Sequence, residues 1–278
     1  MNKIQFNSWL KSPNKTLIMG ILNITPDSFS DGGKFLDSQV AANHAIKMIE
    51  NGADMIDVGG ESSRPGAKPV LIDEELKRIL PVIKAIREKS DCLISVDTYK
   101  SKVAEAALNL GADLINDISS LSFDGKMAGV ISAYKVPLVL MHMQGVPQNM
   151  QLNPLYVNII NDLITFFKSK ISIAKEAGVS NNMIILDPGI GFGKRVDDNF
   201  EIIRELKQIC NMGYPILLGT SRKSFIGDTL GLPINDRLEG TLASVAIGVL
   251  NGAKILRVHD IIEVRRTVTI VERIIGNK

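Results

Sequence analysis

The sequence is poor in cysteine and has no long uncharged apolar run. Only Cys92 and Cys210 occur among its 278 residues, so there is no disulfide framework, and a reducing cytoplasm fits this usage. Neither cysteine has a histidine nearby in the sequence, which disfavours a zinc site. No apolar run reaches the roughly 20 residues of a membrane span, and the N-terminus lacks the charged-then-apolar layout of a signal peptide. We therefore expect a cytoplasmic protein without a membrane partner.

A strong excess of either charge is also missing. The 32 lysines and arginines nearly balance 30 acidic residues, which leaves a formal net charge of +2. Nucleic-acid binding usually needs a strongly basic face, so we expect no nucleic-acid partner. The length is ample for one large core, and no linker or change of composition divides residues 1–278.

Two familiar nucleotide-binding motifs are absent from the stretch MIILDPGIGFGK, residues 183–194. A phosphate-binding loop would have Ser or Thr after Lys194, but Arg195 follows, and Pro188 stands where its first glycine belongs. A dinucleotide fingerprint would place a third glycine at position 194. What remains is Asp187 at the end of an expected strand, followed by a backbone that glycine tolerates best.

Short apolar runs without strict polar alternation are typical of strands buried on both faces. Eight such runs occur, at residues 16–22, 53–58, 92–97, 112–118, 137–142, 183–187, 214–219 and 253–258. Amphipathic stretches at 40–49, 73–89, 99–110 and 260–275 predict helices between and after them, with Asp73 as an N-cap and Asp260 with Glu263 in capping-box spacing. The pattern predicts a single-domain α/β protein, a (β/α)8 TIM barrel with residues 1–15 as a lead-in. Trp9 is expected to plug the barrel bottom or pack outside. The alternative, an open doubly wound sheet, lacks its dinucleotide fingerprint.

Polar residues gather at the C-terminal ends of the expected strands, which face one common mouth in such a barrel. Asp97, Asn116 and Asp187 offer acceptors for a ligand rich in N–H donors. Cationic donors for a diphosphate come from Arg64, Lys223, Arg257 and His259. Asn23 can give an oxygen to Mg²⁺, and Met141, Phe192 and Phe29 supply apolar walls. The mouth is therefore interpreted as a site for a flat polar heterocycle that carries a diphosphate.

Each of these residues also has a structural interpretation. Asp97 and Asp187 could be helix caps or members of an ion-pair network, Asn116 could be a turn residue, and Met141 could belong to the core. The functional interpretation is favoured because all of them fall at one end of the strands, while the opposite turns at 51–54 and 110–113 hold none.

Nine stretches, in order and with fitting spacing, resemble the dihydropteroate synthase family: MGILNITPDSFSDGGKF (19–35), DVGGESSRPGA (57–67), SVDTYK (95–100), GADLINDIS (111–119), LMHMQGVPQNMQ (140–151), LDPGIGFGK (186–194), GTSRKSFIG (219–227), RLEGT (237–241) and RVHD (257–260). The resemblance implies the eightfold barrel and a transferase of folate biosynthesis that uses Mg²⁺. Enzymes of that family join 4-aminobenzoate to (7,8-dihydropterin-6-yl)methyl diphosphate, and sulfonamides mimic their aminobenzoate. They are usually homodimers, and residues 242–250 offer an apolar helix for such an interface or for core packing.

The same resemblance implies a role for individual residues. The pterin would contact Asp97, Asn116, Asp187 and Lys223, with Met141 and Phe192 lining its pocket. Asn23 matches the Mg²⁺ and diphosphate position, while Arg257 and His259, helped by Arg64, match the diphosphate clamp. Two long loops, 24–36 and 60–70, would supply Phe29, Ser63, Arg64 and Pro65 to the aminobenzoate site, together with Ser224. Asp31 matches a residue that steadies a cationic intermediate, so the catalytic set would be Asp97, Asp187, Lys223 and Asp31.

Two positions depart from the family's pattern. Ser63 replaces a threonine, and Ile190 replaces the first aromatic residue of DPGFGFGK; both are expected near the aminobenzoate side. The sequence disfavours three other functions. A methyltetrahydrofolate:corrinoid methyltransferase would not need the cationic clamp. An inactive paralogue should have lost Asn23, Asp97 or Lys223, and a sugar-phosphate aldolase would need a Schiff-base lysine inside a strand.

Overall fold

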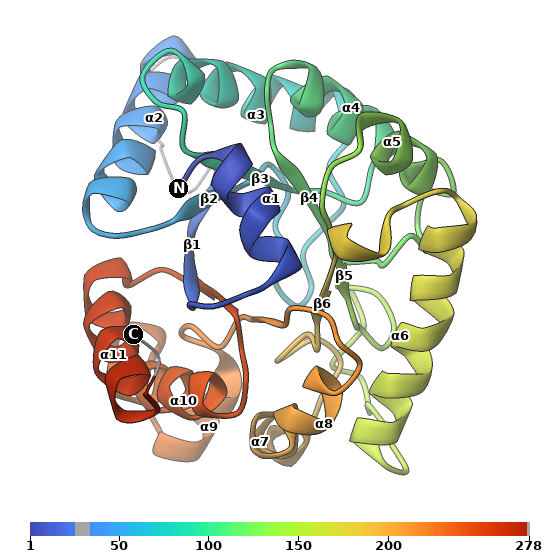
Figure 1. Ribbon diagram of the computed structural model, residues 1–278, viewed down its shortest axis with the longest axis vertical. Helices are drawn as coiled ribbons and strands as arrows, with labels where there is room; N and C mark the ends of the chain where they lie inside the picture. The colour runs from blue at the N-terminus through green and yellow to red at the C-terminus, as the bar shows by residue number, and fades with distance from the viewer. Residues whose placement is uncertain (26–33, 277–278) are drawn as a thin grey trace.

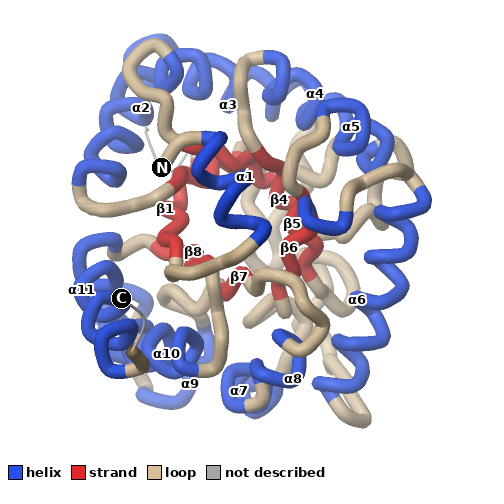
Figure 2. Tube along the Cα trace, viewed as in Figure 1, coloured by secondary structure: helices blue, strands red, loops and turns tan. Residues whose placement is uncertain are grey.

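The computed structural model describes residues 1–25 and 34–276, with the side chains of residues 34–37 outside that description. Eight parallel strands form one sheet in the order β6-β5-β4-β3-β2-β1-β8-β7. A parallel bridge between Leu186 and Ile216 joins β6 to the segment that leads into β7, so the ring of strands closes (Figure 2). The strands are β1 (Leu17–Asn23), β2 (Met55–Gly59), β3 (Leu93–Asp97), β4 (Leu114–Asp117), β5 (Leu138–Met141), β6 (Ile184–Asp187), β7 (Leu217–Leu218) and β8 (Ile255–Val258).

Helices surround this ring, as Figure 1 shows. They are α1 (Lys3–Lys11), α2 (Lys34–Glu50), α3 (Ile72–Arg87), α4 (Ser101–Asn109), α5 (Met127–Tyr134), α6 (Ile159–Glu176), α7 (Val196–Arg204), α8 (Leu206–Cys210), α9 (Ser224–Leu230), α10 (Leu238–Leu250) and α11 (Ile261–Ile274). The predicted (β/α)8 barrel is confirmed. A doubly wound sheet is excluded, because its two edges would stay open, whereas the Leu186–Ile216 bridge closes this sheet between β6 and the segment that leads into β7. Among the described helices, none combines the length and the apolar character needed to cross a membrane.

The lower half of the barrel interior is a closed apolar core. Strand side chains alternate between the interior and the surrounding helices, so both faces of each strand are buried. One interior cluster joins α1 to the strands through Phe6, Trp9, Leu10, Leu17, Met19, Met55, Leu93, Leu114, Val139, Ile185, Leu217 and Ile255. Helix α1 lies across the end of the barrel nearest the viewer in Figure 1. Trp9 therefore plugs the bottom of the barrel, and the site must open at the other end.

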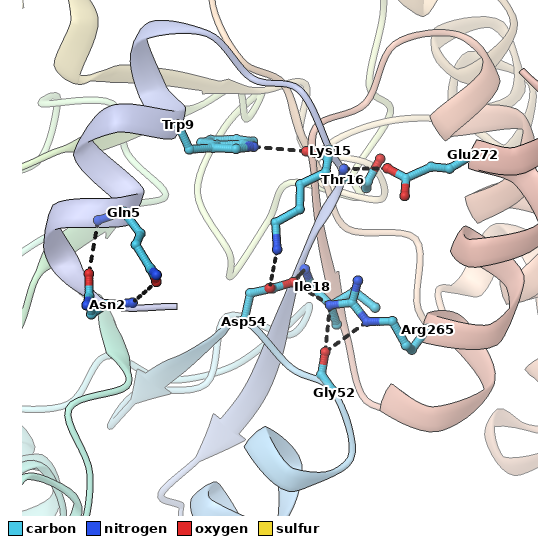
Figure 3. A network of polar contacts seen from close by, with 10 residues as sticks. All are labelled: Asn2, Gln5, Trp9, Lys15, Thr16, Ile18, Gly52, Asp54, Arg265 and Glu272. Atoms are coloured by element: carbon cyan, nitrogen blue, oxygen red, sulfur yellow. Dashed lines mark hydrogen bonds and ion pairs between the residues drawn. The ribbon is translucent and has the colours of Figure 1, made fainter. Parts of the chain in front are cut away.

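Polar contacts at this bottom end are structural (Figure 3). Asp54 accepts a hydrogen bond from the backbone N–H of Ile18 at 2.9 Å and binds the guanidinium of Arg265 on α11. The ammonium of Lys15 lies 3.3 Å from the other oxygen of Asp54. Trp9 donates its indole N–H to the carbonyl of Lys15 at 2.9 Å. These bonds tie the lead-in segment to the first two strands and the last helix.

Two predicted helix caps are wrong. Helix α3 begins after Leu71, so Asp73 lies inside its first turn and caps nothing. Asp260 does occupy the N-cap position of α11, but its side chain makes no capping hydrogen bond. Its carboxylate binds Arg222 instead, with Nη2 2.5 Å from Oδ1. The tertiary ion pair replaces the local bond that the spacing with Glu263 suggested.

Candidate active site

Three of the expected site residues lie in one row across the mouth of the barrel. The strand register places Asn23 beside Gly59, Gly59 beside Asp97, and Asp97 beside Asn116. A methyl group added at Gly59 would lie 3.6 Å from Oδ1 of Asn23 and 3.8 Å from Oδ2 of Asp97. The absence of a side chain at Gly59 thus leaves Asn23 and Asp97 on either side of one shared space.

Arg257 lies inside the barrel and bridges two carboxylates. Its Nε lies 2.6 Å from Oδ2 of Asp57, and its Nη2 lies 2.8 Å from Oδ2 of Asp97. Burial raises the pKa of Asp97 above its ordinary value, while the Arg257 guanidinium opposes the shift. Removal of the arginine would leave two acidic groups together in a dry interior, which is costly. The structural interpretation of Asp97, a member of an ion-pair network, is therefore correct alongside any role in binding.

Asp57 belongs to the same network and was missing from the predicted site. It is fully buried on β2 and accepts a hydrogen bond from Nδ2 of Asn116 at 3.1 Å. Because only the NH₂ group of an amide can donate to a carboxylate, this bond fixes which end of Asn116 is the acceptor. Oδ1 of Asn116 is buried and has no hydrogen-bond partner among the described residues. The signal for Asp57 was an acidic residue inside the otherwise apolar run 53–58.

Asp187 ends β6 beside Met141 of β5, and a tight glycine turn follows it. Its Oδ1 accepts the backbone N–H of Gly189 at 2.7 Å. Gly189 has a φ of +68°, and a side chain there would meet the carbonyl oxygen of His142 at 1.9 Å. Burial raises the pKa of Asp187 to about 6, opposed by the Gly189 N–H and the charge of Lys223. The glycine-rich stretch is therefore a wall of the pocket that aims Asp187, not a phosphate cradle.

Lys223 brings a positive charge to this wall. Its ammonium lies 4.1 Å from the centre of the Phe192 ring, a distance typical of cation–π contact. Phe192 packs with Met141, Ile118 and Met150 in an apolar cluster at the mouth. Desolvation, together with the charge of Arg257, lowers the pKa of Lys223 to about 8, and the charges of Asp187 and Asp97 oppose the shift. Lys223 thus stands in the combined field of Asp187, Asp97 and Arg257.

The loop that carries Lys223 is held in an unusual conformation at Arg222. Arg222 has a φ of +56°, a region that non-glycine residues seldom adopt and that needs support from the surrounding structure. Its N–H donates to Oγ1 of Thr241 at 3.1 Å, and its carbonyl accepts from Nη1 of Arg237 at 3.1 Å. Its guanidinium binds Asp260, the residue after His259. The stretch 237–241 therefore fixes the backbone that presents Lys223.

Lys194 does not face a ligand. It is 3% exposed, and its ammonium lies 3.0 Å from Nδ1 of His142 and 3.0 Å from the carbonyl oxygen of Phe192. Burial lowers the pKa of Lys194 to about 7, and burial together with this lysine lowers that of His142 to about 2. The pair joins the end of β5 to the turn that carries Phe192.

The remaining predicted residues lie on the rim or on loops. His259 is exposed, and its Nδ1 lies 2.9 Å from Oγ of Ser221. Arg64, Pro65 and Ser224 are exposed, and the structure does not join them to the polar row. Ser63 is half-buried and lines a small cavity together with Asp97. Phe29 and Asp31 lie outside the described residues.

Ile190 lies in the core, and its expected place near the aminobenzoate side stays a prediction. Ile190 is 1% exposed and packs in the core between the strands and the helices, not in the cluster at the mouth. An isoleucine in place of an aromatic residue there is a change of core packing.

Asn23 is the residue that suits a hard cation. Its amide oxygen lies at the mouth, next to the carboxylate of Asp97. Within residues 1–25 and 34–276, no group of three or more His, Cys, Asp or Glu residues could hold a metal by itself. This donor set fits Mg²⁺ that keeps most of its shell as water and phosphate oxygens, which is that ion's usual habit.

A family model described as "Pterin binding enzyme" matches residues 19–259. The matched residues include nearly all of the strands of the closed parallel barrel, the buried acceptor row at its mouth and the cationic loop beside it. The dihydropteroate synthase of Clostridium beijerinckii is 52% identical over 94% of this chain and 95% of its own.

Two solved structures agree with this match. The dihydropteroate synthase of Clostridium difficile, crystallised in the presence of pteroic acid, superposes with a TM-score of 0.89 at 46% identity and covers 95% of this chain and 98% of its own. That of Xanthomonas albilineans with 4-aminobenzoic acid gives a TM-score of 0.89 at 37% identity and covers 95% and 94%. The chain belongs to the dihydropteroate synthase family, and it is a transferase.

Proposed function

We propose that this enzyme condenses (7,8-dihydropterin-6-yl)methyl diphosphate with 4-aminobenzoate, giving 7,8-dihydropteroate and diphosphate for folate biosynthesis. The observation that carries the proposal is the convergence of Asp97, Asn116 and Asp187 with Lys223 inside one barrel mouth. Asp97 and Asn116 are linked through Asp57 and Arg257, and Asp187 interacts with the charges of Arg257 and Lys223. The relatives' complexes with pteroic acid and with 4-aminobenzoic acid support the two substrate classes.

The pterin would be bound by its hydrogen-bonding edge. Carboxylates accept hydrogen bonds only, so Asp97 and Asp187 would pair with ring and amino N–H groups. Asn116 would add its buried amide oxygen, which the bond to Asp57 leaves without a partner among the described residues. Lys223 would donate to an acceptor of the ring, and Met141 and Phe192 would pack on its faces. A site whose buried acceptors need donors rejects ligands without them.

The diphosphate would leave toward the cationic side of the mouth. Arg257 uses Nε and Nη2 for Asp57 and Asp97, so its Nη1 is the donor that we assign to the diphosphate. His259 and Arg64 would complete this clamp from the rim. Departure of the diphosphate leaves a positive charge on the pterin methylene carbon. Preorganised carboxylates stabilise such a charge without reorganisation, and Asp97, Asp187 and Asp31 are the residues proposed for it.

The second substrate then attacks through its amine. An arylamine is neutral at pH 7, so no strong base, catalytic triad or covalent nucleophile is required. Ser63, Pro65, Phe29 and Ser224 are proposed to bind 4-aminobenzoate, and its site would be complete only after the pterin substrate is bound. Tight binding of 4-aminobenzoate to the free enzyme, without diphosphate or the pterin substrate, would contradict this order.

Mg²⁺ is proposed as the cofactor, held by Asn23. Bound there, it would offset negative charge on the diphosphate. The single amide donor of Asn23 at the mouth supports an ion that arrives with the substrate. Mg²⁺ affinity should therefore be weak for the free enzyme and rise when diphosphate is present.

A homodimer in the cytoplasm is also proposed. Helix α10 exposes Ile247 (45%) and Leu250 (49%) on one face, whereas the half-buried Leu242 packs against the core. Exposed apolar side chains in such a row favour contact with a second copy. Sedimentation of the wild type and of Ile247→Glu should show a dimer and a monomer respectively, and an unchanged species would exclude α10 as the interface. The unpaired Cys92 and Cys210 fit a reducing compartment.

The direct test of function is diphosphate release by the purified enzyme. Release should require both substrates and Mg²⁺, with 7,8-dihydropteroate formed in equal amount. Chelation of Mg²⁺ should stop it, and re-addition should restore it. Release from the pterin substrate alone at the full rate, or no release with all components, would overturn the proposal.

A further inference from the structure

The loop between β2 and α3 is fastened at its base by Glu61. Oε2 of Glu61 accepts the backbone N–H of Val70 at 2.9 Å, so the two ends of the loop are held together. Between them lie Ser63, Arg64 and Pro65, the residues proposed for 4-aminobenzoate and diphosphate. Farther along, the loop is tied to the rest of the chain by a hydrogen bond from the N–H of Gly66 to the carbonyl of residue 147 at 3.0 Å.

Two residues that follow β3 hold Glu61 in turn. The hydroxyl of Tyr99 donates to Oε1 of Glu61 at 2.8 Å, and the ammonium of Lys100 lies 2.5 Å from Oε2. Lys100 also lies 4.6 Å from the centre of the Tyr99 ring. The loop base is thereby connected to the segment that starts at Asp97, a residue of the pterin site.

Lys100 also forms an ion pair with a second carboxylate, that of Glu75 on α3. Glu75 is 1% exposed, and its Oε1 has no hydrogen-bond partner among the described residues. The side chains of Lys100 and Glu61 are each only 12% exposed. One ammonium thus serves two shielded carboxylates from different elements. Removal of one partner from such a buried group leaves charge unpaired, and the structure must move to rehydrate it.

A small cavity places this cluster against the substrate side. Its lining includes Glu61 and Glu75 together with Ser63 and Asp97. A shift of Glu61 is therefore transmitted to Ser63 two residues later. Asp97 and Asn116 are different, because the hydrogen-bonded strands fix their positions.

We propose that Lys100 is a positioning residue for the 4-aminobenzoate site. It acts through Glu61, which it holds against Glu75 and the β3–α4 junction, and it touches neither substrate. The inference rests on the proposed function, since it assigns Ser63 and its loop to 4-aminobenzoate. Its consequence is a selective effect, with the second substrate affected and the pterin spared.

The first test is Lys100→Met, which keeps the length of the side chain and removes its charge. KM for 4-aminobenzoate should rise about tenfold or more, as expected when a buried ionic contact that orders a loop is lost. Equilibrium binding of the pterin substrate, measured by calorimetry in the absence of 4-aminobenzoate, should stay within about twofold of wild type. Tyr99→Phe removes one hydrogen bond to Glu61 and should give a smaller change in the same direction.

A double variant separates positioning from charge balance. Lys100→Met with Glu75→Gln restores the net charge of the three groups, so the melting temperature should recover toward wild type. The contact to Glu61 is still missing, so KM for 4-aminobenzoate should stay raised. Recovery of KM in the double variant would overturn the positioning role.

The matched control is Arg87→Met at the other end of α3. Arg87 pairs with Asp113 at 2.5 Å at the bottom of the barrel, away from the loop. The Arg87→Met substitution should lower the melting temperature without changing KM for 4-aminobenzoate or for the pterin substrate. Equal changes of the two KM values in Lys100→Met, or a KM change in Arg87→Met, would contradict the inference. Wild-type enzyme without diphosphate release would instead overturn the proposed function, so the two failures are distinguishable.

Discussion

Arg257 on β8 and Asp97 on β3 meet inside the barrel, with Nη2 of the arginine 2.8 Å from Oδ2 of the aspartate. The two residues are 160 positions apart in the chain and lie on strands that are not neighbours in the sheet. Asp57 holds the same guanidinium from β2, at 2.6 Å. The cation proposed for the diphosphate is therefore oriented by the same carboxylate that is proposed for the pterin, so the two halves of the site are mechanically joined.

The first prediction concerns Asp97 itself. Asp97→Asn should lower turnover by about 100-fold or more, because a carboxylate that accepts pterin N–H groups and stabilises a developing cation is lost. Circular dichroism and the melting temperature should remain near wild type, since Asp57 still holds Arg257. Asp113→Asn is the contrast: it breaks a structural pair at the barrel bottom and should lower stability while turnover is kept. Retained turnover in Asp97→Asn would refute the assignment.

Asp57 should control which end of the Asn116 amide faces the ligand. In Asp57→Asn the new side chain can donate its NH₂ group to Asn116, which allows the Asn116 amide to flip. The NH₂ group of Asn116 would then face the ligand in place of the acceptor oxygen, so KM for the pterin substrate should rise about tenfold or more. The exchange variant Asp57→Asn with Asn116→Asp restores an amide–carboxylate pair and leaves an acceptor oxygen for the pterin. Pterin binding should partly recover in the exchange variant; no recovery would exclude amide orientation as the cause.

The rate should depend on pH through acidic and basic groups with opposite requirements. Burial raises the pKa of Asp187 to about 6 and that of Asp97 to about 7, so their acceptor forms are lost as the pH falls through this range. Desolvation lowers the pKa of Lys223 to about 8, so its charge is lost as the pH rises above that value. kcat/KM for the pterin substrate should thus be bell-shaped, with an acid limb between about pH 6 and 7 and an alkaline limb near pH 8. Lys223→Arg, whatever its rate, should move the alkaline limb to higher pH, because a guanidinium stays charged.

The raised pKa of Asp187 also makes the free energy of unfolding depend on pH. The folded protein keeps a proton on Asp187 up to about pH 6, whereas an unfolded chain releases it near the ordinary aspartate pKa of 3.8. The folded state therefore binds more protons in this window, and the contribution of Asp187 to the free energy of unfolding falls as the pH rises through it. Comparison of urea unfolding for wild type and Asp187→Asn between pH 4 and 7 should show this difference, and parallel pH profiles would contradict it.

Thr241 should stabilise the backbone at Arg222. Thr241→Val keeps the shape but removes the acceptor for the N–H of Arg222, and a lost buried partner costs about 1–3 kcal/mol. The free energy of unfolding should fall by that amount, and KM for the pterin substrate should rise because Lys223 is less well placed. Thr229→Val is a suitable control, since the Thr229 hydroxyl donates to the carbonyl of Phe225 in its own helix at 2.7 Å. Equal effects of both variants on KM would oppose a special role for Thr241.

Trp9 should matter for folding but not for catalysis. Trp9→Ala opens the apolar floor between α1 and the strands, and a truncation of this kind costs about 3–5 kcal/mol. Urea unfolding should show the loss, while both KM values stay as in wild type at temperatures where the variant is folded. A change in KM would mean that the floor of the barrel transmits strain to the mouth.

The sequence by itself determined the barrel and which polar residues stand at the ends of its strands. Eight apolar runs separated by helical stretches suffice for the architecture, because a strand buried on both faces needs no polar alternation and parallel strands need crossover helices. The same regularity exposes the site, since Asp97, Asn116, Asp187 and Arg257 interrupt apolar runs at one end of the strands. Seven-residue β1 and two-residue β7 show the limit of such predictions: strand length depends on pairing with neighbours, which composition does not encode.

Only the tertiary structure decided which of these polar side chains contact one another. Asp57 was hidden within a strand, and its importance follows from contacts with Arg257 and Asn116, both distant in the chain. Asp260 has the spacing of a local cap, yet its carboxylate binds the guanidinium of Arg222 from another loop, because this ion pair forms two charge-assisted hydrogen bonds between opposite charges. Lys100 lies in the stretch SVDTYK, but no local pattern indicated its role, since its two acidic partners come from a loop and a helix. Local sequence sets which groups reach the mouth, and the closure of the barrel sets which of them meet.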